Sequence, residues 1–159
     1  MTVKKPITQA GFDKLRAEIT HLTEIERPDI GRIVADARAL GDLSENAEYQ
    51  ASREKQRNIE AKIRALQMIM SVSEVVDCKN IPDKSRVRFG AKVEIVDVKT
   101  GKEIEFTIVS AYESDVKQNL ISIDAPIARG LIGKKIGDIC KIEIGDNVTE
   151  VEVESVEYL

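Results

Sequence analysis

The chain has 159 residues, of which 24 are Lys or Arg and 28 are Asp or Glu, so its formal net charge at pH 7 is −4. Nucleic-acid affinity depends on neutralising phosphates, so this charge argues against a protein that binds free nucleic acid by itself. The 42% of apolar residues can form a core, which excludes wholesale disorder. No apolar run approaches the roughly 20 residues that span a bilayer, and the first residues lack the apolar core of a signal peptide.

The cysteine and histidine content narrows the chemistry further. Cys78 and Cys140 stand far apart without a CxxC motif, which favours a reducing cytoplasm over a disulfide framework. Cys140 falls in an alternating apolar run, so it is predicted to be a buried strand residue. Together with His21 the two cysteines are too few for a structural zinc site, which takes about four ligands. A single histidine also leaves little room for a Ser-His-Asp hydrolase.

Apolar residues recur three and four positions apart through the first part of the chain, which predicts helices with an apolar seam. Thr8 is a candidate N-cap, and Pro28 predicts a kink or an irregular turn within the first helix. Gly41 follows the last periodic residue, as expected after a helix C-terminus. Because the connection is short, the two helices are predicted to pair as an antiparallel coiled coil. The predicted seam consists of Phe12, Leu15, Ile19, Leu22, Ile30, Ile33, Ala37 and Leu40, and then of Ala47, Ala51, Ile59, Ile63, Leu66 and Met70.

From about Val75 onward apolar residues alternate with polar ones, which predicts strands. Proline at 126 and glycine at 133 favour a short helix between them. The fold class is therefore α+β: residues 1–75 form an antiparallel two-helix coiled coil, and residues 76–159 form a small, mostly antiparallel β domain with a short helix. An antiparallel hairpin satisfies its own seam, so a monomer is expected. Strands are predicted over residues 91–95, 103–108, 120–123, 139–144 and 148–156.

The connection between the helices, an acidic tip at residues 41–48, carries two carboxylates three positions apart, Asp42 and Glu45. The pair fits a capping box, in which Asp42 accepts from the amide of residue 45 and Glu45 reaches back. It also fits a metal site, because Mg²⁺ is usually held by one or two carboxylates together with waters and substrate phosphates. A hairpin cannot enclose a substrate, so a partner would have to supply the remaining ligands. The two roles are compatible, and the spacing leaves both open.

Two stretches of the sequence resemble the bacterial Gre transcript cleavage factors. The first is GDLSENAEY at residues 41–49, followed by Arg53 and Glu54. The second is KQNLISIDAPIARGLIGK at residues 117–134. Both stand in the order that the family has, and the resemblance covers essentially the whole length of the chain.

The resemblance implies that the coiled coil enters the secondary channel of bacterial RNA polymerase, where the 3′ end of backtracked RNA protrudes. Asp42 and Glu45 match the family's tip carboxylates, which help hold a Mg²⁺ ion and an attacking water in the polymerase's own active site. The protein would then have no cofactor of its own and would be no enzyme, but an activator of the polymerase's transcript hydrolysis. Arg38 and Arg53 match a basic patch near the tip that contacts the extruded RNA.

The second half of the chain has its own counterpart in the family. There an FKBP-like domain grips the polymerase near the rim of the channel, and the matching loop here includes Asp124 and Pro126. Pro126 fixes its own φ and biases Ala125 toward extended geometry, so this loop is expected to have a defined shape. The family also implies a cytoplasmic protein.

Two other functions stay open on the sequence. A regulator could bind in the same channel without any cleavage, although the Asp-x-x-Glu tip is that of the cleavage-active members. The β domain could also act alone as an FKBP-like chaperone or prolyl isomerase. FKBP-like pockets are lined with aromatic residues, and this half of the chain has few of them. The sequence therefore supports the chaperone or prolyl isomerase function only weakly. These aromatic residues are Phe89, Phe106, Tyr112 and Tyr158.

Overall fold

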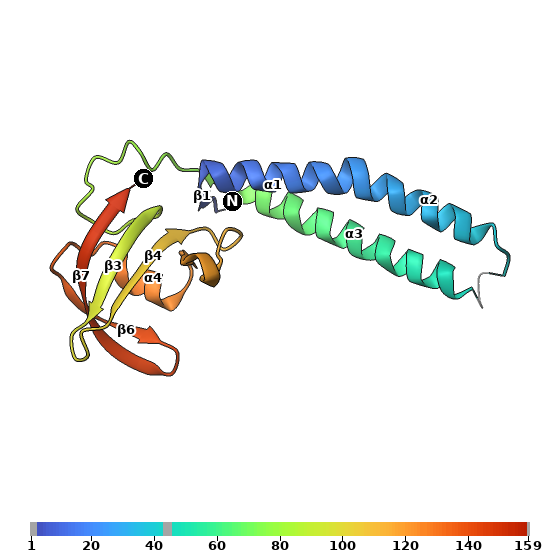
Figure 1. The fold of residues 1–159 in the computed structure, drawn as a ribbon. Coiled ribbons are helices and arrows are strands. Elements are labelled where there is room, and N and C mark those ends of the chain that lie inside the picture. Colours follow the sequence, from blue (N-terminus) through green and yellow to red (C-terminus); the bar gives the residue numbers. More distant parts are fainter. Residues whose placement is uncertain (1–2, 43–45, 159) are drawn as a thin grey trace. The chain divides into compact units, whose positions relative to one another are not determined.

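The computed structural model describes residues 3–42 and 46–158, and the chain divides into two compact units (Figure 1). Residues 12–72 form a helical hairpin, and residues 1–11 group with residues 73–159 into a β unit. The predicted boundary between residues 75 and 76 lies close to the second division, whereas the first eleven residues belong with the β unit. Within the described part of the chain no helix has the length and apolar character that crossing a membrane requires.

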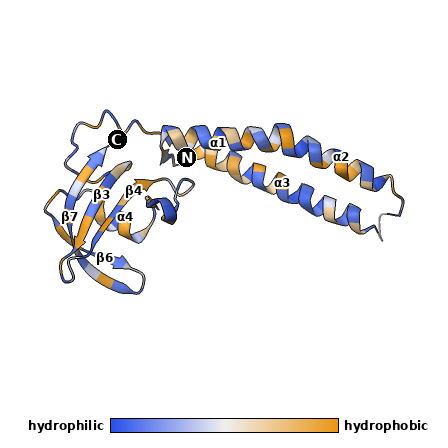
Figure 2. Ribbon diagram, in the orientation of Figure 1, coloured by the Kyte–Doolittle hydropathy of each residue, from blue (hydrophilic) through white to orange (hydrophobic). Residues whose placement is uncertain are grey.

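The hairpin consists of two helical arms joined by a short connection. The first arm runs through α1 (Gln9–His21), a π-helical turn η1 (Leu22–Glu26) and α2 (Arg27–Arg38), and the second arm is α3 (Ala47–Val72). Hydrophobic residues recur along both arms (Figure 2). Those at the interface of the arms are buried, so the predicted antiparallel helical hairpin is confirmed. The buried residues are Leu15, Leu22, Ile30, Val34 and Ala37 on the first arm, and Ser52, Ile59, Ile63 and Leu66 on the second.

The irregular turn that Pro28 predicts lies immediately before this proline. Pro28 occupies the first turn of α2, where its missing N–H and its ring prevent a regular helical bond to the preceding turn. In η1 the backbone N–H of Arg27 donates instead to Leu22 O, five residues back. A π turn takes up one residue more than an α turn does. Leu22 and Ile30 are therefore both 2% exposed although they stand eight positions apart, and the seam stays in phase.

The seam predicted for α2 is wrong in two positions. Ile33 and Leu40 are 43% and 70% exposed, and Val34 is buried in place of Ile33. Val34 stands four positions after Ile30 and follows the phase that the π turn sets. Leu40 lies beyond the last residue of α2, so it is not held against the other arm.

The second arm departs from the predicted seam at the same end. Ala47 and Ala51 are exposed, and Ser52 is buried instead. A small polar residue can occupy this place because its hydroxyl is satisfied: Ser52 Oγ donates to the carbonyl of Tyr49 at 3.0 Å. Propensity and spacing alone would not select a serine over an alanine here.

The β unit is built on a five-stranded mixed sheet with the order β5-β4-β3-β7-β6. β5 pairs in parallel with β4, and the other three pairs are antiparallel. The short helix α4 (Pro126–Leu131) covers part of this sheet, and a 3₁₀ turn, η2 (Val116–Gln118), precedes β5. The predicted α+β fold, with a mostly antiparallel sheet and one short helix, is therefore confirmed. The strands are β3 (Ala91–Asp97), β4 (Glu103–Val109), β5 (Leu120–Ser122), β6 (Ile139–Ile144) and β7 (Asn147–Tyr158).

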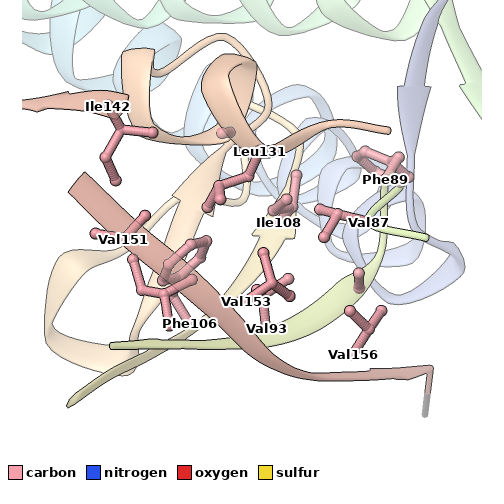
Figure 3. Packing of buried hydrophobic residues seen from close by; sticks show 13 residues of the cluster. Val87, Phe89, Val93, Phe106, Ile108, Leu131, Ile142, Val151, Val153 and Val156 are labelled. Carbon is pink, nitrogen blue, oxygen red and sulfur yellow. The ribbon is translucent and has the colours of Figure 1, made fainter. Parts of the chain in front are cut away.

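The core of the β unit lies where α4 meets the inner face of the sheet (Figure 3). Gly130 of α4 approaches β6 so closely that a β-carbon on it would lie 2.7 Å from Ile142 Cγ2. Cys140 is a strand residue that packs against this core, but it is only partly buried where its alternating pattern predicts full burial, and desolvation raises the pKa of its thiol. The side chains labelled in Figure 3 are Val87, Phe89, Val93, Phe106, Ile108, Leu131, Ile142, Val151, Val153 and Val156.

A second, two-stranded sheet explains why the first residues belong to the β unit. β1 (Lys5–Ile7) pairs in parallel with β2 (Ser73–Val75), and Val76 N donates to Ile7 O at 3.0 Å beyond the ladder. Directly after β1, Thr8 caps α1: its Oγ1 accepts from Gly11 N at 3.0 Å, which confirms the predicted N-cap.

The carboxylate of Glu113 links this N-terminal segment to the turn that follows β4. It accepts from Thr8 N at 3.3 Å and from the Thr8 hydroxyl, and also from Ser110 N at 3.1 Å and Ser110 Oγ at 2.7 Å. Gly11 leaves the space for this carboxylate, because a β-carbon at position 11 would overlap the Glu113 side chain. Position 11 is therefore a glycine for lack of room, although it lies in a helix.

Because of this packing, alanine substitutions at two glycines are expected to change the stability of the protein in opposite directions. Gly11→Ala displaces Glu113 from its four donors and is expected to destabilise the protein by about 1–3 kcal/mol, the cost of leaving partly buried polar groups unpaired. Gly31→Ala, in α2, meets no atom within 4 Å, so it should stabilise by about 0.5–1 kcal/mol through helix propensity. Thermal and urea unfolding of the two variants measures both effects. Stabilisation by both substitutions would contradict the assigned role of Gly11.

Candidate functional site

The connection between the two arms brings a carboxylate to the end of the hairpin. The helix α2 ends at Arg38, and Gly41 follows with a φ of +123°, a conformation that side-chain-bearing residues rarely adopt. The glycine therefore lets the chain turn where the sequence predicts it. Asp42 comes next and is exposed. Glu45, the second predicted tip carboxylate, lies outside the described residues.

Asn46, which sequence reasoning missed, caps the second arm. α3 begins at Ala47, and Asn46 Oδ1 accepts from Tyr49 N at 3.0 Å in the geometry of an N-cap. The amide nitrogen Nδ2 of the same side chain donates to Ala37 O of α2 at 2.8 Å. The N-cap of α3 is therefore Asn46 and not Asp42. Asparagine is among the most favoured N-cap residues, so the sequence did contain the signal.

Basic side chains of the tip lie near Tyr49. Arg38 Nη2 donates to Tyr49 Oη at 3.5 Å, and Arg38 Cζ lies 5.8 Å from the centroid of the ring. The hydrogen bond from Arg38 lowers the pKa of the Tyr49 phenol, and the charges of Arg38, Arg53 and Arg57 act in the same direction, against a smaller desolvation effect that raises it. Of the two predicted RNA contacts, Arg38 thus contacts the Tyr49 ring, whereas Arg53 acts on the Tyr49 phenol through its charge alone. We call Arg38, Tyr49, Arg53 and Arg57 the basic flank.

The basic flank continues as a groove of about 410 Å³ along α3. Among the described residues that line it, Glu60 is the one acid, and this carboxylate is already paired with Arg27, from which it accepts two hydrogen bonds at 2.7 and 3.0 Å. Within the groove Arg53 donates to the side-chain oxygen of Gln56. The residues that line the groove are Arg53, Gln56, Arg57, Glu60 and Arg64.

A second hollow, of about 370 Å³, lies at the tip itself and contains acidic groups. The side chains of Asp42 and Glu48 both line it, beside Leu40, Asn46 and Ala47. Carboxylate oxygens are the ligands that Mg²⁺ prefers, so the chemistry of these donors fits that ion. Two carboxylates on an open surface leave most of an octahedral shell to water or to a partner. Among the described residues, the hollow thus presents two carboxylates and leaves the remaining ligands of any metal to other groups.

The predicted docking residues, Asp124 and Pro126, lie on the β unit and are exposed. Ala125 between them has φ −66° and ψ 146°, the extended geometry that a following proline favours. Asp124 N donates to Ser122 Oγ at 3.1 Å, and Pro126 begins α4. The loop thus has the defined shape that its sequence predicts, with a carboxylate on its surface.

Neighbouring strands also bring together three acids that the sequence did not single out. Carboxylate oxygens of Glu94, Glu103 and Glu154 lie within 4.8 Å of one another on β3, β4 and β7. Desolvation, followed by repulsion from the other acids, raises the pKa of Glu154. Ser155 Oγ donates to Glu94 at 3.1 Å and satisfies one of these groups. The cluster is a consequence of cross-strand register.

Comparison with known proteins identifies the architecture. A family model described as "Transcription elongation factor, N-terminal" matches residues 5–75, and one described as "Transcription elongation factor, GreA/GreB, C-term" matches residues 82–158. The chain belongs to the GreA/GreB family of transcription elongation factors. The family resemblance seen in the tip and in residues 117–134 is thereby confirmed.

Individual GreA/GreB relatives match over nearly their full length. Transcription elongation factor GreA of Rickettsia bellii (strain RML369-C) is 42% identical over 158 residues, which cover 99% of this chain and 97% of the relative. GreA of Yersinia pestis is 45% identical over 154 residues, 97% of this chain and 98% of the relative. Among solved structures, that of the transcription factor Gfh1 is 21% identical, covers 99% of both chains and has a TM-score of 0.47.

The contact between Arg38 and Tyr49 can be tested by titration. Arg38→Gln replaces the guanidinium by a shorter, uncharged amide, so the pKa of the Tyr49 phenol should rise toward the ordinary value of a tyrosine. Tyrosinate absorbance against pH measures this shift, and subtracting the curve of Tyr49→Phe assigns the transition. The matched control is Arg32→Gln on the same helix, which should leave Tyr49 unchanged. An equal pKa of Tyr49 in wild type and Arg38→Gln would contradict the contact.

Proposed function

We propose that this protein binds bacterial RNA polymerase, inserts its hairpin into the secondary channel and stimulates the polymerase's own hydrolysis of backtracked RNA. The observation that carries the proposal is the composition of the tip. One end of the hairpin presents an exposed carboxylate, Asp42, together with guanidinium groups gathered around Tyr49. Acidic ligands for a metal and basic ligands for phosphate are the two groups that RNA hydrolysis by metal ions needs. Arrested complexes would resume synthesis from the new 3′ end.

The tip carboxylates act as ligands that complete a site in the polymerase. Asp42 and Glu45 would supply the carboxylate oxygens that Mg²⁺ takes as ligands. They would hold a Mg²⁺ ion shared with the polymerase, which supplies activation of water and stabilisation of charge at the phosphate. The tip itself is open, so the reaction belongs to the polymerase. In this account the protein is an activator and not an enzyme, and it needs no cofactor of its own.

The remaining residues position the RNA and the protein. Arg38 and Arg53 attract the phosphates of the extruded RNA, for which the forked guanidinium group is well suited. They also offset the repulsion that the tip acids exert on RNA. On the β unit, the loop of Asp124 and Pro126 docks on the polymerase. Its shape is fixed by Pro126 before binding, which reduces the entropy lost on association.

The carboxylates are tested by neutral substitutions of similar size. Asp42→Asn and Glu45→Gln each remove a charge from the metal and should lower cleavage at saturating protein at least about tenfold, the loss typical even for residues that only support a metal ligand. Binding to polymerase and helicity should stay near wild type. Asp36→Asn, an exposed acid on α2, is the matched control and should cleave normally. Wild-type cleavage by the folded Asp42→Asn protein would remove Asp42 from the chemistry.

The basic flank is tested by concentration and salt. Arg53→Ala should lower cleavage mainly at low protein concentration, because it weakens attraction to RNA and leaves the metal ligands in place. The wild-type rate below saturation should also fall as salt is added, since salt screens exposed charges. Lys55→Ala, on α3 but outside the basic flank, serves as the control. A defect of Arg53→Ala that persists at saturating protein would argue against this role.

The docking loop is tested by competition. Asp124→Ala and Pro126→Ala should each weaken displacement of labelled wild-type protein from polymerase, while unfolding temperatures change little because both side chains are exposed. Asp146→Ala, an exposed acid in the turn after β6, is the control. Unchanged competition by both loop variants would place the docking surface elsewhere.

A further inference from the structure

One side chain at the tip connects the ends of both arms. Asn46 Nδ2 donates to Ala37 O, one of the last carbonyls of α2, and Asn46 Oδ1 accepts from Tyr49 N, one of the first amides of α3. Helix ends leave four such groups without regular helical partners, and each of the two bonds adds a partner to one of them. A single amide therefore fixes the distance between the two points where the connection of residues 39–46 leaves and rejoins the helices.

Tyr49, whose amide donates to Asn46, makes a second contact between the ends of the two arms. It contacts the Arg38 guanidinium through its hydroxyl and its ring. Two bridges thus cross the connection side by side, one between Ala37 and Asn46 and one between Arg38 and Tyr49. Between them the chain passes through Gly41, whose φ of +123° is a conformation that side-chain-bearing residues rarely adopt.

We propose that Asn46 is a positioning residue for the tip carboxylate: it closes the end of the hairpin so that Asp42 is presented in one geometry. This inference rests on the proposed function of Asp42 as a metal ligand. The two residues line the same hollow at the tip. Asparagine alone among the good N-cap residues has both a side-chain N–H donor and a carbonyl acceptor at this length. Serine and aspartate can cap α3, but serine is too short and ionised aspartate has no hydrogen to donate to Ala37 O.

Loss of the hydrogen bond from Asn46 to Ala37 should lower the rate of RNA cleavage more than the stability of the protein. Ala37 O also accepts from Leu40 N at 3.2 Å, so loss of the Asn46 donor does not leave this carbonyl without a partner. A displacement of about 1 Å in a reacting group can nevertheless lower a rate by about 10²-fold. Asn46→Ser keeps the cap of α3 and removes only the bond to Ala37, so it isolates the closure. Asn46→Ala removes both bonds.

The experiment uses the full chain with backtracked elongation complexes and Mg²⁺. It compares wild type, Asn46→Ser, Asn46→Ala and Asp42→Asn, with Asn58→Ser on the exposed side of α3 as the matched control. The maximal cleavage rate and the protein concentration that gives half of it are measured separately. Hydrogen exchange of the free proteins reports on the Tyr49 amide. For Asn46→Ser we expect a maximal rate lowered at least about tenfold, with the half-saturating concentration, helicity and Tyr49 protection near wild type.

The outcomes separate this inference from the function on which it rests. If Asp42→Asn is impaired and Asn46→Ser cleaves at the wild-type maximal rate, the positioning role is overturned and the function of Asp42 stands. If Asn46→Ser changes only the half-saturating concentration, Asn46 serves binding, and the inference is equally wrong. If Asp42→Asn is unimpaired, the proposed function fails and the positioning role fails with it. Faster exchange of the Tyr49 amide in Asn46→Ala alone supports the assignment of the two bonds.

Discussion

The two arms of the hairpin hold each other through one narrow seam, and everything that the tip presents depends on that seam staying in phase. The seam must pass Pro28, which a regular helix cannot accommodate in its interior. The π turn before the proline takes up one extra residue, so Ile30 and Val34 still face α3. Each large apolar side chain buried there contributes about 1.5–3 kcal/mol. A slip of the seam would rotate the end of α2, and Arg38 with it, away from Tyr49.

The tip combines two kinds of charge that oppose each other in binding RNA. A carboxylate repels phosphate, and it is useful beside RNA only if a cation lies between them. The guanidinium groups around Tyr49 would attract RNA phosphate at all times, whereas a metal ion would attract it only beside the carboxylate that holds the metal. In the proposed function, placing both on one hairpin end would let a chain with net charge −4 act on RNA, although this charge argues against affinity for free nucleic acid.

Periodicity predicted the hairpin and the sheet, because each has a repeating apolar pattern, whereas Pro126 and Gly133 predicted the short helix. It could not predict Val34 as the buried residue, since the phase after Pro28 depends on how the π turn pairs with the other arm. The contact of Glu113 with the N-terminal segment joins residues more than a hundred positions apart and has no local signal. Asn46 was missed because a carboxylate in the same motif also fits a cap, and only the observed helix start distinguishes them. The role of Glu45 stays a prediction.

The central claim is that this protein makes polymerase cut its own transcript. The most direct measurement adds the full-length wild-type protein and Mg²⁺ to a stalled, backtracked elongation complex with labelled RNA and follows both RNA ends. The account predicts release of a short 3′ fragment and renewed extension of the remaining RNA after nucleotides are added, at a rate that depends on protein concentration. Binding of the protein to the complex with no change in the RNA would contradict it and would indicate a regulator that occupies the channel without cleavage.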